Sequence, residues 1–87
     1  MNTADHIRER LLALGPESLA LEDESAQHRG HAGAAAGGGH YRLTIVSPKF
    51  RNLSTLARHR LVYETLGELM QREIHALSIS ALTPEEL

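Results

Sequence analysis

The chain has 87 residues, of which 41% are hydrophobic and 3% aromatic, so it predicts one domain over residues 1–87 with a small, mainly aliphatic core. It contains no cysteine, which excludes disulfides, thiolate nucleophiles and thiolate metal ligands from this chain. Its formal net charge of −2 argues against a dedicated nucleic-acid binder. No apolar run approaches the roughly 20 residues of a membrane span, and the first residues lack the apolar segment of a signal peptide, so we expect a cytoplasmic protein.

The first 23 residues predict a helix followed by a strand. Over residues 3–14, four apolar residues recur at the spacing of one helical face: Ala4, Ile7, Leu11 and Leu14. Gly15 and Pro16 end this helix, because glycine tolerates a left-handed conformation and proline cannot continue the hydrogen-bond ladder. Residues 18–23 alternate apolar and polar side chains and predict a short strand.

A segment rich in glycine and alanine separates this strand from the next one. Residues 24–39 contain five glycines, five alanines and no large apolar residue, so we expect a mobile hairpin loop. The segment matches neither GxxxxGK[ST] nor GxGxxG, which excludes these phosphate-binding loops. Residues 40–47 then give the clearest strand pattern, and residues 47–54 form a connector with Phe50 and Leu53 turned toward the core.

The C-terminal part predicts a long helix and a last strand. The helix runs from Ser54 to Arg72, with His59 inside its apolar face. The residues expected to form that face are Leu56, Val62, Tyr63, Leu66, Leu69 and Met70. Residues 76–82 predict a strand with Leu77 and Ile79 turned inward, and residues 83–86 resemble the first turn of a short helix.

The predicted order is α-β-β-α-β, an α/β (α+β) domain. The first two strands form an antiparallel hairpin, and the third follows a helix and therefore runs parallel to the second through a right-handed crossover. We expect a three-stranded mixed sheet with the helices packed on one face.

Several stretches of this sequence resemble the BolA family over roughly residues 3–86. They are DES at 23–25, HYRLTIVSPKF at 40–50, RHRLVYETL at 58–66 and IHALSISALTPEE at 74–86. The resemblance implies a fold similar to class II KH domains, which agrees with the order derived above. It also implies partnership with a monothiol glutaredoxin of the CGFS type in iron-sulfur cluster trafficking or iron homeostasis. In some bacteria, family members act as transcriptional regulators of morphology and stress response. One departure is Asn52, which stands where the family usually has the glycine of an F-x-G turn.

The resemblance implies a metal site made of histidines. The family's C-terminal histidine ligand corresponds to His75, and a second ligand from the hairpin loop corresponds to His31 or His40. These histidines and sulfur from glutaredoxin and glutathione would share a [2Fe-2S] cluster. We therefore expect a monomer that binds no cluster alone and forms a heterodimer with glutaredoxin. From the residues alone, His75 has the parity of Leu77 and Ile79 and is also compatible with a histidine at the edge of the core, while His31 and His40 are also compatible with ordinary surface positions.

Two other functions remain open from the sequence, and an enzyme is not expected. Residues 40–60 contain five basic residues and no acidic one, which favours either a solvated basic face or a nucleic-acid contact: Arg42, Lys49, Arg51, Arg58 and Arg60. Mononuclear zinc held by His31, His40 and His75 is a third hypothesis. No paired-carboxylate or Ser-His-Asp pattern indicates catalysis.

Overall fold

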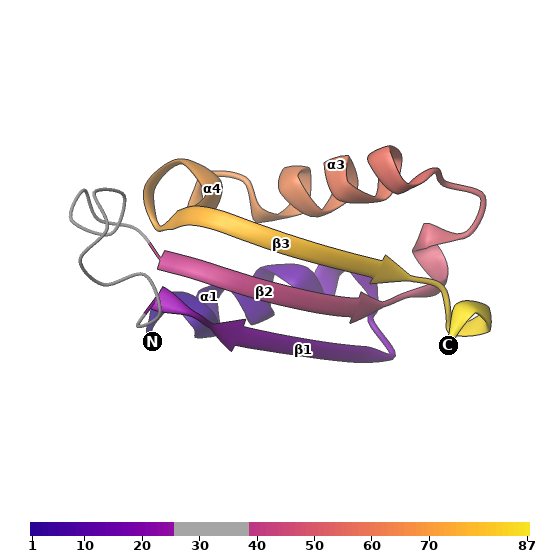
Figure 1. Ribbon diagram of the computed structural model, residues 1–87, viewed down its shortest axis with the longest axis horizontal. Helices are drawn as coiled ribbons and strands as arrows, with labels where there is room; N and C mark the ends of the chain where they lie inside the picture. The colour runs from indigo at the N-terminus through magenta and orange to yellow at the C-terminus, as the bar shows by residue number, and fades with distance from the viewer. Residues whose placement is uncertain (26–38) are drawn as a thin grey trace.

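The computed structural model describes residues 1–25 and 39–87, which form three helices and a three-stranded sheet (Figure 1). The elements are α1 (Thr3–Leu11), β1 (Ser18–Asp23), β2 (Gly39–Val46), α3 (Thr55–Leu66), α4 (Leu69–Arg72) and β3 (Ile74–Leu82). Short 3-10 turns cover Leu12–Leu14, Pro48–Phe50 and Pro84–Glu86. Within the described ranges, no helix is both long enough and apolar enough to cross a bilayer.

The sheet has the predicted mixed topology. Its strand order is β1-β2-β3, with β1 antiparallel and β3 parallel to β2. The parallel pair needs a crossover, and the α3–α4 segment supplies it (Figure 1). The α+β architecture expected from the sequence is therefore confirmed.

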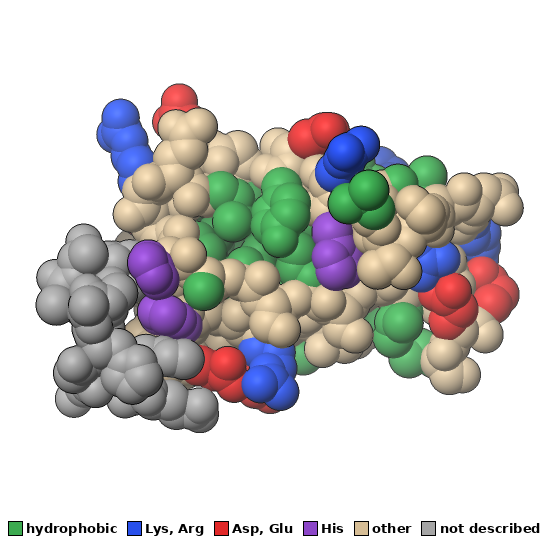
Figure 2. Space-filling model, turned by 45° about the horizontal axis from the view of Figure 1, so that its top comes forward, with side chains coloured by type: hydrophobic (Ala, Val, Ile, Leu, Met, Phe, Trp, Pro, Cys, Tyr) green, Lys and Arg blue, Asp and Glu red, His purple; other side chains and the backbone are tan. Residues whose placement is uncertain are grey.

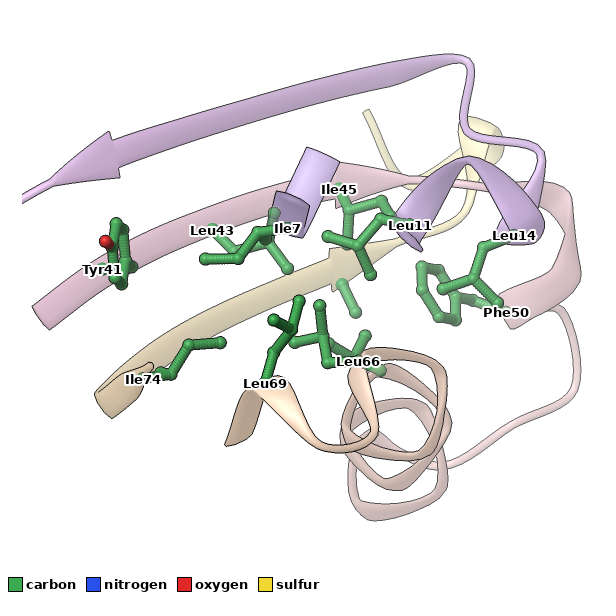
Figure 3. Close-up of a cluster of buried hydrophobic side chains, with 12 residues drawn as sticks. Ile7, Leu11, Leu14, Tyr41, Leu43, Ile45, Phe50, Leu66, Leu69 and Ile74 are labelled. Carbon is green, nitrogen blue, oxygen red and sulfur yellow. The ribbon is translucent and has the colours of Figure 1, made fainter. Parts of the chain in front are cut away.

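The core lies between one face of the sheet and the helices (Figure 3). Its completely buried side chains are Ile7, Leu11, Leu43, Ile45, Phe50, Val62 and Leu66. Because α1, α3 and β2 all contribute to this one cluster, both long helices cover the same face of the sheet, as predicted. The buried Ser47 hydroxyl donates a 2.5 Å hydrogen bond to the Leu14 carbonyl and so fastens the end of the first helical segment to the end of β2.

Two left-handed turns depend on residues that the sequence singles out. Gly15 has φ 56° and ends the first helical segment, as expected. Asn52 has φ 65° and takes the turn that a glycine is expected to occupy. Asparagine is among the few non-glycine residues that enter this region at low cost, so the departure at residue 52 preserves the turn.

The predicted helix from Ser54 to Arg72 is interrupted, and part of its predicted buried face is wrong. Gly67, with φ 55°, ends α3 and separates it from α4. Leu56 is 61% exposed and Tyr63 is 41% exposed, whereas Val62 and Leu66 are fully buried. At about 100° per residue, Leu56 and Tyr63 lie roughly 100–120° around the helix from Val62, outside the narrow stripe that contacts the sheet.

Candidate functional site

His40 and His75 lie side by side at the end of the sheet where β2 and β3 begin. Their ring centroids are 5.0 Å apart, with the ring planes inclined by 45°. Figure 2 shows histidine side chains in contact at this end of the molecule. The structure thus brings together two of the three predicted site histidines, from strands far apart in the sequence.

A β-bulge turns His75 toward this position. The register of β2 and β3 passes from Gly39↔Ile74 directly to His40↔Ala76, so His75 is the extra residue of β3. Ile74 is buried in the core, His75 and Ala76 are both exposed, and regular alternation follows. Two expectations are therefore wrong. The strand begins at residue 74 and not at 76, and His75 does not lie on the same side of the sheet as Leu77, because the bulge reverses the side-chain alternation.

His40 lies on the outer face of β2 and is held at its backbone. Its N–H donates to the Ser25 hydroxyl at 3.1 Å, and its carbonyl accepts from the Glu24 N–H at 2.7 Å. The Ser25 N–H in turn donates to the Asp23 carboxylate at 2.9 Å. Hydrogen bonding from the Ser25 side chain and backbone lowers the pKa of Asp23, so this end of the hairpin keeps its carboxylate ionised.

Gly39, directly before His40, holds the start of β2 to the chain that leads into β3. Its N–H donates to the Glu73 carbonyl at 3.0 Å, which joins β2 to the residue directly before β3. A Cβ atom at residue 39 would lie 2.5 Å from Cε2 of Tyr41, so only glycine fits under that ring without a shift. The Thr3 hydroxyl donates to the Glu73 carboxylate at 3.2 Å and ties the start of α1 to the same corner. Burial, followed by the charge of Asp23, raises the pKa of the Tyr41 phenol.

The sequence reasoning did not identify Gly39 and Glu73 as supports of the site. The one available signal was the glycine directly before the HYR strand, which is unusual for a strand interior. Nothing in the sequence pattern indicated that the Glu73 backbone would meet Gly39, because that contact depends on the register of a parallel pair.

The third predicted ligand, His31, lies outside the described residues, so its place relative to His40 and His75 is not part of this geometry. Within residues 1–25 and 39–87, no group of three or more His, Cys, Asp or Glu side chains could hold a metal ion. Among the described residues, this end of the sheet therefore offers the two imidazoles of His40 and His75. Neutral imidazole is a suitable ligand for iron and zinc, so this donor pair fits an iron centre whose remaining ligands come from elsewhere.

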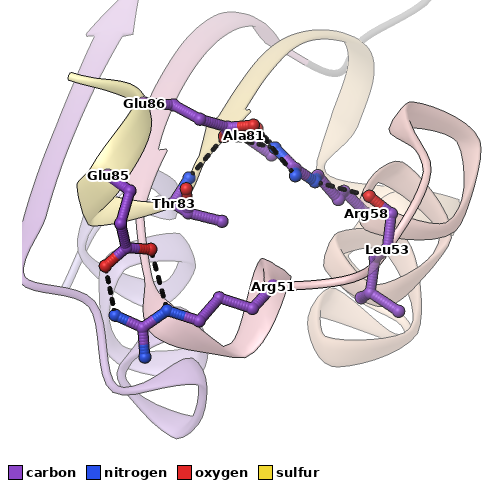
Figure 4. A network of polar contacts seen from close by, with 7 residues as sticks. All are labelled: Arg51, Leu53, Arg58, Ala81, Thr83, Glu85 and Glu86. Atoms are coloured by element: carbon purple, nitrogen blue, oxygen red, sulfur yellow. Dashed lines mark hydrogen bonds and ion pairs between the residues drawn. The ribbon is translucent and has the colours of Figure 1, made fainter.

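Acidic side chains neutralise two of the five basic residues at the opposite end of the sheet (Figure 4). Arg51 makes a two-pronged ion pair with Glu85, and Arg58 pairs with Glu86 at 2.6 Å. The Arg58 guanidinium also donates hydrogen bonds to two backbone carbonyls, those of Leu53 at 2.9 Å and Ala81 at 3.0 Å. The bond to Ala81 joins α3 to the end of β3. The Arg58 side chain is only 14% exposed, so it is not the surface residue expected from the sequence.

Two more of the basic residues also have partners within the chain. Arg42 lies 3.3 Å from the Glu24 carboxylate, and the Lys49 ammonium donates to the Ala13 carbonyl at 3.1 Å. Arg60 is exposed on α3. A stretch that is purely basic in sequence is therefore largely paired in space, by residues from other parts of the chain.

Known proteins are similar to this chain in sequence and in fold. The family described as BolA-like protein matches residues 11–86. The chain is 46% identical over 74 residues to BolA-like protein 1 of Mus musculus, a match that covers 85% of this chain and 52% of the relative. It is 38% identical over 71 residues to a DNA-binding transcriptional regulator BolA of Haemophilus influenzae, covering 82% of this chain and 66% of the relative.

A solved structure gives the same result for the fold. The BolA domain of SufE1 from Arabidopsis thaliana superposes with a TM-score of 0.88 at 42% identity, covering 100% of this chain and 98% of that domain. The chain spans about half the length of the mouse relative and 24% of the length of SufE-like protein 1, chloroplastic/mitochondrial, from Arabidopsis thaliana. The family match over most of the chain, together with these identities, shows that the chain belongs to the BolA family.

Proposed function

We propose that this BolA-family chain is an adaptor that pairs with a monothiol CGFS glutaredoxin and shares the ligation of a [2Fe-2S] cluster, in cluster trafficking or iron homeostasis. The observation that carries the proposal is the contact of His40 with His75 at a ring-centroid distance of 5.0 Å. Two imidazoles this close, in a chain without cysteine, favour a site completed by sulfur from a partner.

The two histidines have complementary surroundings. His75 is exposed on its bulge, so a partner can approach it from solvent. His40 is half-buried and fixed through its backbone by Ser25 and Glu24, which limits the positions that its ring can take. A cluster with mixed imidazole and thiolate ligands supplies electron-transfer chemistry at a higher reduction potential than one held by thiolates alone.

Reconstitution with glutaredoxin tests the proposal. The chain is mixed with a CGFS glutaredoxin and glutathione, iron and sulfide are added without oxygen, and visible absorption and circular dichroism are recorded. We expect a coloured heterodimer whose spectrum changes with His75→Ala. His40→Ala and His31→Ala then decide which of these two supplies the second ligand, and His59→Ala, on α3, is the matched control. A heterodimer whose spectrum is identical for wild type and His75→Ala would remove His75 from the site.

Binding to DNA is the second candidate function. The name of the Haemophilus influenzae relative favours it, whereas the pairing of Arg42, Arg51 and Arg58 with glutamates opposes it. A band-shift titration against salt separates the two possibilities, because each phosphate contact adds about −0.9 to the slope of log K against log salt. A steep slope that becomes shallower in Arg60→Ala would favour a DNA contact at this surface. No binding at low salt would exclude it.

A further inference from the structure

The outer edge of β3 carries backbone groups that face away from the sheet. β3 is the last strand in the order β1-β2-β3 and pairs with β2 alone. The Leu82 carbonyl accepts from the Ser47 N–H at 2.9 Å, so Leu82 directs its backbone groups toward β2. Because these directions alternate along a strand, Leu77, Ile79 and Ala81 direct their N–H and C=O groups to the free edge.

One contact confirms this alternation. Arg58 donates from α3 to the Ala81 carbonyl at 3.0 Å, on the side away from β2. In the described part of the chain, the outward backbone groups of Leu77 and Ile79 receive no comparable bond. Arg58 thus occupies the edge at Ala81. The edge at Leu77 and Ile79 keeps backbone donors and acceptors at the spacing of an extended chain.

A groove with both polar and apolar lining runs beside this edge. A hollow of about 330 Å³ lies between α3 and β3, with Arg58 and His59 on the helix and residues 79–82 on the strand. Figure 2 shows hydrophobic side chains gathered in the space between β3 and the helices. The side chains of Leu77 and Ile79 point to the core side of the sheet but are only half-buried. The helices therefore cover these two side chains incompletely.

We propose that this edge binds an extended polypeptide segment of a partner protein as a fourth strand, with alternate apolar side chains placed over Leu77 and Ile79. Backbone groups of an edge strand bind another extended chain through a regular ladder, and pockets beside the edge select its side chains. α3 covers the face of the sheet and leaves a hollow between itself and β3, so a single extended chain fits beside the edge more readily than the sheet of a second copy (Figure 1). A nucleic acid is disfavoured, because the groove's Arg58 is paired with Glu86 and the chain is net negative.

The test uses the whole chain labelled with ¹⁵N and a blocked octapeptide that alternates valine and threonine. We expect chemical-shift changes centred on the amides of Leu77, Ile79 and Ala81, with slower hydrogen exchange of the first two. Two N-methylated forms of the peptide give the decisive comparison. Methyl groups on the residues whose N–H faces β3 should weaken binding by about tenfold or more, and methyl groups on the alternate residues should leave it unchanged.

Two protein variants supply a matched pair. Ile79→Lys places a charge in the groove and should abolish peptide binding, whereas Ser78→Lys, one residue earlier, on the other face and outside the groove lining, should not. If Ile79→Lys does not fold, the two N-methylated peptides decide the question on the wild-type protein.

Four outcomes would overturn the proposal. The first is that millimolar peptide causes no chemical-shift change at these amides, and the second is that the two N-methylated peptides lose affinity equally. The third is chemical-shift changes that grow with protein concentration alone, which would indicate a second copy, and the fourth is binding of an eight-nucleotide thymidine strand at these amides in place of the peptide. The experiment contains no glutaredoxin or iron, so its result is independent of the proposed cluster function.

Discussion

Gly39, the residue directly before His40, gives the sharpest prediction. In Gly39→Ala, the new methyl carbon would lie 2.5 Å from Cε2 of Tyr41 and 2.8 Å from Cζ and the phenolic oxygen. Carbon atoms in contact are about 3.5–4.0 Å apart, so the ring or the strand must move by roughly 1 Å. Tyr41 is 6% exposed and belongs to the core cluster, so the ring has little free space into which it can turn.

The expected cost follows from that overlap. Forcing one extra methyl group into a packed site costs about 1–3 kcal/mol, and we expect the free energy of unfolding to fall by that amount. Residue 39 also donates to the Glu73 carbonyl and precedes His40, so a shift of the strand changes the relation of His40 to His75. The visible spectrum of any complex that depends on this pair should change with it.

Urea denaturation of a double-mutant cycle measures this effect. Tyr41→Leu removes all three atoms that the new methyl group would meet, so Gly39→Ala should cost much less in the Tyr41→Leu background. An unfolding free energy within about 0.5 kcal/mol of wild type for Gly39→Ala alone would refute the reasoning. The same loss in both backgrounds would also refute it, because the cost would then come from the backbone.

Three further predictions concern the rest of the fold, each checked by urea denaturation. Asn52→Ala should lower the unfolding free energy by about 1 kcal/mol, whereas Asn52→Gly should not, because residue 52 has φ 65°. Ser47→Ala should cost about 1–3 kcal/mol, because the buried Leu14 carbonyl loses its donor. The Arg58 hydrogen bond lowers the pKa of Glu86 from 4.5 to about 2, so this stabilisation is complete above pH 4.5 and is lost as the pH falls through 2. Glu86→Gln should therefore show a smaller decline in stability than wild type across that window.

The sequence predicts the elements well where a periodic pattern continues without interruption. The alternation at residues 40–47 and the apolar spacing of residues 3–14 both correspond to observed elements, with ends within a few residues. The pattern fails at Gly67, because one glycine with φ 55° ends a helix whose apolar spacing alone predicts continuation. The exposed Tyr63 has a different cause, because it lies about 100° around α3 from the buried Val62, outside the stripe that contacts the sheet.

The basic stretch shows a second limit of reading along the chain. Residues 40–60 are free of acidic residues, and this local count favours an open basic face. Glu24 approaches from the hairpin and Glu86 from the C-terminal turn, and both pairings require the folded sheet. Charge counted along a sequence therefore overstates the field at this surface, because tertiary contacts decide which cations remain unpaired.

The position of His75 follows from core packing. An uninterrupted ladder would pair Gly39 with His75, turning the imidazole toward the core and Ile74 toward solvent. The bulge instead leaves Ile74 4% exposed, and burial of an isoleucine side chain contributes about 1.5–3 kcal/mol that an imidazole would not match. The apolar residue before the histidine thus selects the bulge, and the bulge presents the histidine beside His40. The candidate site is therefore stabilised by the same core contacts that hold the sheet to its helices.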